Sequence, residues 1–298
     1  MYKSDSDTIT KAAPPPLSID KRDSISRKEF IKDYVEVSKP VILTQAARSW
    51  HAMGKFTPQY FKEKYGDRKK TIKGVEYTFA ELIDRIMIST PQNPAPYPFN
   101  LNIELEIPEL KEDIIPELSF GKIDRINHPL IPRYMLRGTA LYEIFFGGNG
   151  SSFPYLHYDM LCMNTQITQV FGSKEFIFFP PEQGKYLYPK ADNPKVSPID
   201  VFNPDYEKYP LFRNATPLRV TLLEGETLFF PTSWWHSARI YEPCITIGRA
   251  QLNGVNWNLF LNDEFKVWKK RSKPLAYVMM GYGKFAGALM DIQEKLMS

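Results

Sequence analysis

The pattern of hydrophobic and polar positions predicts helices in the first part of the chain. Ser26 and Thr78 each precede a glutamate by three positions and an apolar run at helical spacing, so each predicts a capped helix. A further helix is expected to open at Pro58 and to end at Gly66. Residues 39–43 read as a short strand between these helices.

Short β-type runs replace the helical pattern after about residue 132. Turns rich in glycine, such as residues 147–150 and 224–225, separate them. The predicted strands are residues 141–146, 165–171, 175–179, 218–223, 227–230 and 244–247. Many short strands with regular turn signals are typical of an all-β sandwich or barrel.

Helical spacing returns from residue 256. The run from Leu275 to Leu296 suits an amphipathic helix pair, although Gly281, Gly283 and Gly287 weaken it. These helices fit a cap on the barrel and a homodimer face equally well. We expect four segments, which are a flexible arm (1–20), a helical and strand region packed on the barrel (21–131), a β core (132–255) and C-terminal helices (256–298).

Composition and charge indicate an ordinary globular protein. Hydrophobic residues make up 43% of the 298 residues, and the formal net charge is only +4. This mild basic character argues against nucleic acid as a partner, without excluding it. The two cysteines, the lack of an apolar leader at the start and the lack of a long apolar run together favour a cytoplasmic protein with no membrane contact.

Two of the four histidines lie where a metal site is expected. His157 and Asp159 are separated by one residue, so in an extended chain their side chains point to the same side. His236 follows a predicted strand, and a barrel returns it to the first pair. Two imidazoles and one carboxylate form the facial triad of non-haem Fe(II) oxygenases, which leaves positions open for a 2-oxo acid and for oxygen. The triplet alone also fits an ordinary hydrogen-bonded histidine near a turn.

Four stretches carry a family resemblance. They resemble the JmjC/cupin-like Fe(II)- and 2-oxoglutarate-dependent oxygenases, and among these the asparaginyl hydroxylase of hypoxia-inducible factor. The stretches are residues 26–50 (SRKEFIKDYVEVSKPVILTQAARSW), 148–181, 199–210 (IDVFNPDYEKYP) and 224–236 (EGETLFFPTSWWH). The resemblance implies a mainly β fold with flanking helices, a double-stranded β-helix of jelly-roll type, with residues 132–255 as its cupin/JmjC-like core.

The resemblance also implies roles for four residues. It assigns His157, Asp159 and His236 as the ligands of the catalytic metal, and Lys174 as the cation that binds the distal carboxylate of 2-oxoglutarate. A lysine that points into a barrel is costly unless it meets an anion, which agrees with this assignment. Without the resemblance, a lysine after a turn reads as solvated.

The remaining cosubstrate contacts stay open between alternatives. Thr165 corresponds by counting to a polar contact in the family, but the stretch after Asp159 is longer here, so Asn164 is the alternative. The family threonine before the first histidine is a proline here. Tyr155 is then a candidate to supply the hydroxyl, with Ser152 and Tyr142 as alternatives.

The expected activity is hydroxylation of a substrate C–H bond with Fe(II), O2 and 2-oxoglutarate as cosubstrate. A protein or peptide side chain is the expected substrate. The alternatives are the same chemistry on RNA, on a small molecule or on methyl-lysine, and a non-catalytic cupin-like module that only binds a metal.

Overall fold

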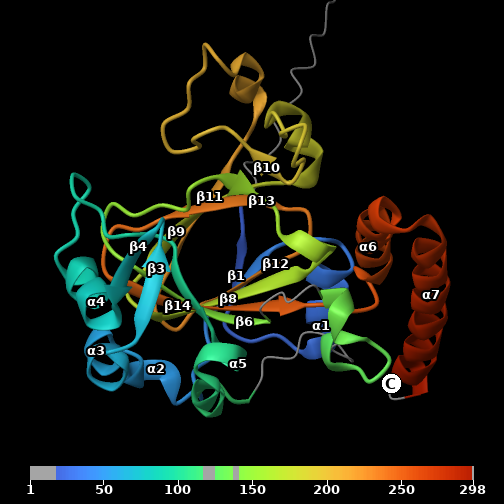
Figure 1. Cartoon of the computed structure of the whole chain (residues 1–298), viewed down its shortest axis with the longest axis horizontal. Helices are drawn as coiled ribbons and strands as arrows, with labels where there is room; N and C mark the ends of the chain where they lie inside the picture. Colours follow the sequence, from blue (N-terminus) through green and yellow to red (C-terminus); the bar gives the residue numbers. More distant parts are fainter. Residues whose placement is uncertain (1–17, 117–124, 137–140, 297–298) are drawn as a thin grey trace, which may run out of the picture.

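Two β-sheets face each other in the computed structural model, which describes residues 18–116, 125–136 and 141–296 (Figure 1). Residues 1–17 of the predicted arm lie outside these ranges. The larger sheet has 7 strands in the order β1-β2-β12-β8-β14-β6-β5. These strands are β1 (Asp20–Arg22), β2 (Val41–Leu43), β12 (Thr227–Phe230), β8 (Asn164–Phe171), β14 (Cys244–Gln251), β6 (Tyr142–Gly147) and β5 (Phe99–Asn102).

The smaller sheet has 5 antiparallel strands in the order β10-β7-β13-β9-β11. They are β10 (Val196–Ser197), β7 (Leu156–His157), β13 (Trp235–Arg239), β9 (Lys174–Phe179) and β11 (Leu218–Leu222). A separate hairpin joins β3 (Lys69–Ile72) to β4 (Val75–Thr78).

Helices surround the two sheets. They are α1 (Arg27–Phe30), α2 (Ala52–Lys55), α3 (Pro58–Tyr65), α4 (Phe79–Met87), α5 (Ile103–Glu106), α6 (Trp257–Arg271) and α7 (Lys273–Leu296). In Figure 1, α2 to α5 lie beside one end of the larger sheet, and the α6–α7 hairpin lies at the other end. No helix within the described ranges is both long and apolar enough to cross a bilayer.

The core between the sheets is aromatic and aliphatic. Ile167 and Leu228 from the larger sheet pack with Phe176, Phe178 and Ala238 from the smaller one. Burial of side chains of this size is the dominant stabilising contribution to a fold of this kind. The facing sheets and flanking helices confirm the predicted jelly-roll class.

Local sequence signals account well for the elements they predict. Ser26 and Thr78 both form capping boxes with the expected glutamates, and all seven predicted strands are present within two residues at their starts. Strands β1, β2 and β5 precede residue 132, so the first region contributes strands to the larger sheet as well as helices around it. Asp20, assigned to the arm, begins β1. The four-segment division stays a prediction.

The C-terminal run is one helix rather than a pair, which corrects the prediction. Residues 273–296 form α7 without a break, and its partner is α6. A Cβ at Gly283 would lie 2.3 Å from Leu261 Cδ2, and one at Gly287 would lie 2.3 Å from Trp257 Nε1. These glycines therefore allow α7 to approach α6 closely, and that packing outweighs their low helix propensity.

We expect Gly287→Ala to lower the free energy of unfolding by about 1–3 kcal/mol, because the new methyl group overlaps Trp257. Gly281→Ala is the matched control, since a Cβ there has no neighbour within 4 Å. That variant should gain up to about 1 kcal/mol from helix propensity. Chemical denaturation measures both. Equal stability of the two variants would contradict the close approach of the helices.

Candidate metal centre

Strand β13 brings the two histidines together. It lies between β7 and β9, and His236 pairs with His157 on one side and with Phe178 on the other. Directly opposed residues of an antiparallel pair point to the same side of the sheet, at Cα separations of about 4.5–5.5 Å. His236 lies inside β13, a strand that the sequence pattern did not predict.

The three candidate ligands converge on one point. One nitrogen each from His157 and His236 and one oxygen of Asp159 lie within 4.8 Å of one another. Asp159 Oδ1 is 3.7 Å from Nε2 of each histidine. Bonds of about 2.0–2.2 Å from one ion span such separations after a small inward movement.

Hydrogen bonds orient both imidazoles for coordination. Nδ1 of His236 is 3.0 Å from the Trp234 carbonyl oxygen, and Nδ1 of His157 is 3.4 Å from the Tyr155 carbonyl oxygen. Because a carbonyl only accepts, each Nδ1–H donates, and each Nε2 keeps its lone pair toward the centre. This support through the second ring nitrogen is usual for metal-binding histidines.

Aromatic rings shield the centre. The Phe153 ring stacks on His157 at 4.6 Å, and the Phe230 ring lies 4.7 Å from that of His236. Burial, and next the neighbouring His236, lower the pKa of His157 to about 3. A neutral imidazole is the form that binds a metal, so no proton competes for Nε2 near neutral pH.

Thr165 fixes the carboxylate of the triad. Its Oγ1 donates a hydrogen bond to Asp159 Oδ2, which leaves Oδ1 facing the two histidines. The chain turns sharply between them, with Leu161 and Cys162 in the left-handed region at φ 59° and 51°. Thr165, expected to contact the cosubstrate, thus orients a candidate ligand here.

Lys174 is buried inside the barrel. Its side chain is on the first residue of β9, its exposure is 5%, and its Nζ lies 5.4–5.6 Å from the ring centres of Tyr97, Phe145 and Phe176. Burial lowers the pKa of the Lys174 ammonium. The nearby Tyr97 hydroxyl and Cys244 thiol raise it by more, so the pKa of Lys174 is raised overall. Lys174 therefore remains a cation.

No carboxylate in the described residues forms an ion pair with Lys174. Lys174, Phe176 and Phe178 stand at every second position of β9, so their side chains point to one face of the sheet. His236 pairs with Phe178 and therefore points to that same face. A buried cation without a protein anion is costly, and an anionic ligand in the barrel removes that cost. Tyr97, beside Lys174, comes from a proline-rich stretch that gave no signal in the sequence.

The other two candidates lie elsewhere. Asn164 points to the opposite side of β8 from Thr165, and its Oδ1 accepts a hydrogen bond from the Thr232 backbone N–H at 2.9 Å. It thereby holds the loop before β13. Tyr155 is 41% exposed, and its ring meets that of His157 edge-on at 5.2 Å. It lies at the rim of the centre, beside His157.

A jelly roll with a His-X-Asp pair on one strand edge and a second histidine on the adjacent strand defines the cupin-type metal proteins. Comparison with known families agrees: the cupin-like domain model matches residues 26–249. This chain belongs to the cupin-like domain family.

Individual relatives include JmjC-domain proteins. The chain is 29% identical over 234 residues to the lysine-specific demethylase 8 of Xenopus tropicalis, covering 73% of this chain and 49% of that protein. It is 27% identical over 265 residues to the lysine-specific demethylase JMJ21 of Arabidopsis thaliana, covering 83% and 26%.

A shorter match, 34% identical over 107 residues, is to the tRNA wybutosine-synthesizing protein 5 of Gallus gallus, covering 36% of this chain and 32% of that protein. The chain thus spans about half the length, or less, of these relatives.

We expect Thr165→Val to weaken binding of Mn(II) or Co(II) by about 10–100-fold, because Asp159 loses the bond that orients it. Isothermal titration calorimetry of the metal-free chain measures this. Thr221→Val, at an exposed position of β11, is the matched control and should bind like the wild type. Unchanged affinity in Thr165→Val would show that the hydroxyl does not support the site.

Proposed function

We propose that this chain is an Fe(II)- and 2-oxoglutarate-dependent oxygenase that hydroxylates a C–H bond of a protein side chain. The single observation that carries the proposal is the buried Lys174, a cation with no carboxylate partner in the described residues, on the same barrel face as the triad. A metal site alone also fits a binding module, whereas a metal site plus a buried anion site fits a chelating dicarboxylate.

The donor set fits ferrous iron. Two imidazole nitrogens and one carboxylate oxygen, with the remaining positions free, are the ligands of the non-haem Fe(II) oxygenases. When bound, iron and 2-oxoglutarate supply the oxidation, in which O2 and 2-oxoglutarate become succinate and CO2 while one oxygen atom enters the substrate as a hydroxyl group.

The protein's own residues bind, orient and exclude water. His157, Asp159 and His236 hold the metal, and Thr165 keeps Asp159 Oδ1 turned toward it. Lys174 binds the distal carboxylate of 2-oxoglutarate as a charge-assisted pair. The aromatic rings around His236 keep water from the reacting centre. The edge-on Tyr155 is placed to meet an incoming substrate at the rim.

The relatives favour a protein substrate. Three of the matches that cover 73–83% of this chain are named lysine-specific demethylases, whereas the tRNA-related match covers 36% of it. Hydroxylation of an N-methyl group also releases that group, so demethylation of methyl-lysine is the same chemistry on another carbon.

Lys174→Met should raise the KM for 2-oxoglutarate by at least about tenfold, because the charged partner of its distal carboxylate is lost. Succinate formation with Fe(II), with and without candidate peptides, measures the reaction. Lys190→Met, at an exposed lysine, is the matched control. His157→Ala should abolish turnover. Succinate formation that survives in His157→Ala would overturn the proposal.

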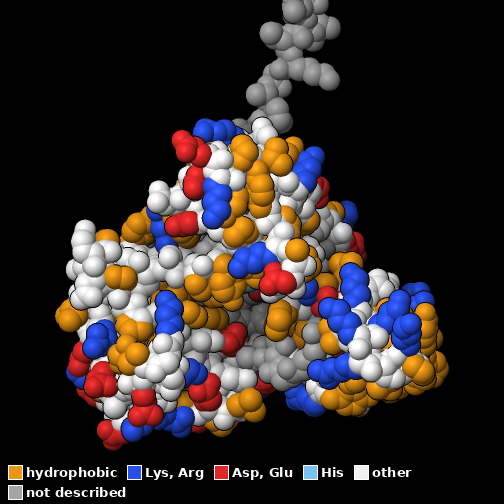
Figure 2. All heavy atoms as spheres, turned by 45° about the horizontal axis from the view of Figure 1, so that its top comes forward, with side chains coloured by type: hydrophobic (Ala, Val, Ile, Leu, Met, Phe, Trp, Pro, Cys, Tyr) orange, Lys and Arg blue, Asp and Glu red, His pale blue; other side chains and the backbone are white. Residues whose placement is uncertain are grey.

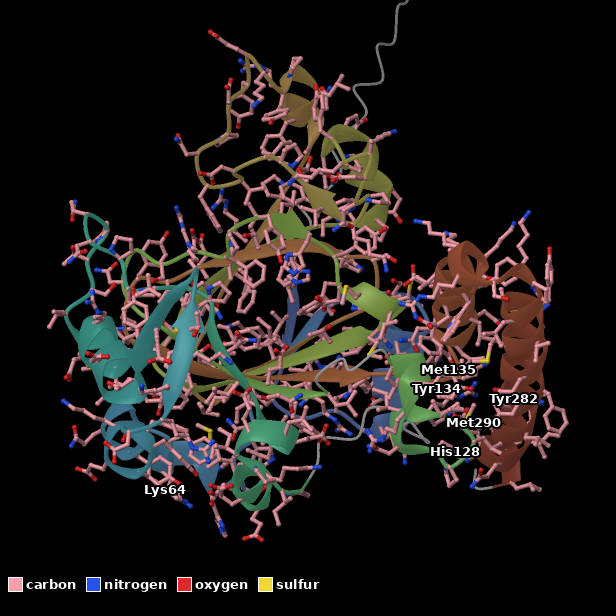
Figure 3. All side chains as sticks on the ribbon, in the orientation of Figure 1. Lys64, His128, Tyr134, Met135, Tyr282 and Met290 are labelled. Atoms are coloured by element: carbon pink, nitrogen blue, oxygen red, sulfur yellow. The ribbon has the colours of Figure 1, made fainter. Side chains whose placement is uncertain are left out.

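We also propose that α7 pairs with α7 of a second copy of this chain. One face of the helix is apolar and exposed, with its residues alternating three and four apart as in a heptad seam. These residues are Leu275, Val278, Tyr282, Phe285, Leu289, Ile292 and Leu296. Tyr282 is labelled on α7 in Figure 3, and its hydroxyl also donates a hydrogen bond of 2.7 Å to the Leu130 carbonyl oxygen. Figure 2 shows hydrophobic side chains along the outer edge of this hairpin. A seam of this pattern is self-complementary, which favours an identical helix as the occupant.

Phe285→Lys together with Ile292→Lys should convert a dimer to a monomer that keeps the wild-type circular dichroism spectrum, because both side chains are exposed within one chain. Light scattering after size-exclusion chromatography measures the mass. Lys284→Glu, outside the seam, should leave the mass unchanged. A wild-type chain that stays monomeric at high concentration would contradict this pairing.

A further inference from the structure

Glu143 faces the interior that holds the triad. It pairs with Gly248 on β14, and Gly248 pairs with Ile167 on β8. Opposed residues of a sheet point to one side, and Ile167 belongs to the core between the sheets. Thr165, two residues from Ile167 and so on the same side, bonds Asp159. The Glu143 carboxylate and the metal ligands therefore share one space.

This space is open along the larger sheet. Glu143, Phe145, Thr165 and Ala250 face inward and are partly exposed, whereas the residues that alternate with them on these strands are buried. The inward positions of β14 nearest Glu143 are glycine and alanine, so no large side chain of that strand separates Glu143 from Thr165.

A single neutral group holds the carboxylate in place. Asn100 Nδ2 donates a hydrogen bond of 2.6 Å to Glu143 Oε1. Among the residues that the structure describes, no lysine or arginine forms an ion pair with Glu143. The nearby Lys70 is paired with Glu106 at 3.3 Å instead. The second oxygen, Oε2, is therefore available to accept a further bond.

Burial, together with the negative charge of Asp159, raises the pKa of Glu143, while the hydrogen bond from Asn100 lowers it. Both raising influences act against a lone negative charge. A cation bound at Oε2 offsets the cost of burial, because it pairs the carboxylate. The position thus fits a positively charged guest and disfavours an anionic one.

We propose that Glu143 binds a cationic side chain of a polypeptide substrate, namely a lysine or methyl-lysine ammonium or an arginine guanidinium. Asn100 is a positioning residue that holds the carboxylate on the inward side of β6. Glu143 on β6 and Thr165 on β8, which bonds Asp159, lie on either side of the small residues of β14, so a side chain anchored on Glu143 presents carbon atoms to the metal centre. This inference rests on the oxygenase proposal and names the substrate class for that same site.

The test measures binding rather than turnover. Three synthetic peptide pools carry a fixed central Lys, Arg or Gln among degenerate neutral positions. Their affinity for the full chain, loaded with Mn(II) and N-oxalylglycine, is measured by fluorescence anisotropy. The wild type should prefer the Lys or the Arg pool over the Gln pool by at least about tenfold, and Glu143→Gln should remove the preference.

Glutamine keeps the acceptor for Asn100, so Glu143→Gln changes charge more than shape. Glu76→Gln makes the same change in net charge at an exposed hairpin and should keep the wild-type preference. Equal binding of the three pools by the wild type, binding of none of them, or an unchanged preference in Glu143→Gln overturns the inference. Succinate formed by the wild-type enzyme without any peptide tests the oxygenase proposal separately.

Discussion

The backbone pairing of β13 with its two neighbours is the constraint on which the site depends. β13 carries His236, β7 carries His157, and one register pair sets their separation. A shift of one residue would turn His236 to the other face of the sheet, where it meets neither Asp159 nor the barrel interior. The pairing of β13 with β9 also fixes which residues of β9 face inward, and so decides that Lys174 shares the space with the triad.

The interior of the barrel is organised by charges that the described part of the protein leaves without ionic partners. Lys174 is buried among aromatic rings, where an anionic ligand would stabilise its charge. Glu143 lies where the interior is partly open, and a cationic ligand would stabilise its carboxylate. A cation at one position and an anion at another therefore make the two ends of the interior favour ligands of opposite charge. An anionic cosubstrate and a cationic substrate would each find one favourable place and be disfavoured at the other.

Local signals in the sequence were enough for the capping boxes at Ser26 and Thr78 and for the strands with strong alternation or long apolar runs. They missed β7 and β13 because these strands are 2 and 5 residues long and carry polar side chains toward the interior. Those polar side chains are the candidate ligands. The polarity that a metal site needs therefore removes the apolar pattern by which a strand is predicted. Tertiary packing decided the rest: only contact with Trp257 explains why Gly287 sits in a continuous helix.

Strand β7 has 2 residues and is held by its pairs with β10 and β13 and by the buried Leu156. An ion bound by His157, Asp159 and His236 would bridge β7 to β13 and so act as a cross-link of the smaller sheet. Occupancy of the site then adds to the stability of the folded chain in proportion to the logarithm of the free metal concentration. A bound ion would therefore decide how firmly the β10–β7 end of the smaller sheet is held, and this end would open more easily in the metal-free chain.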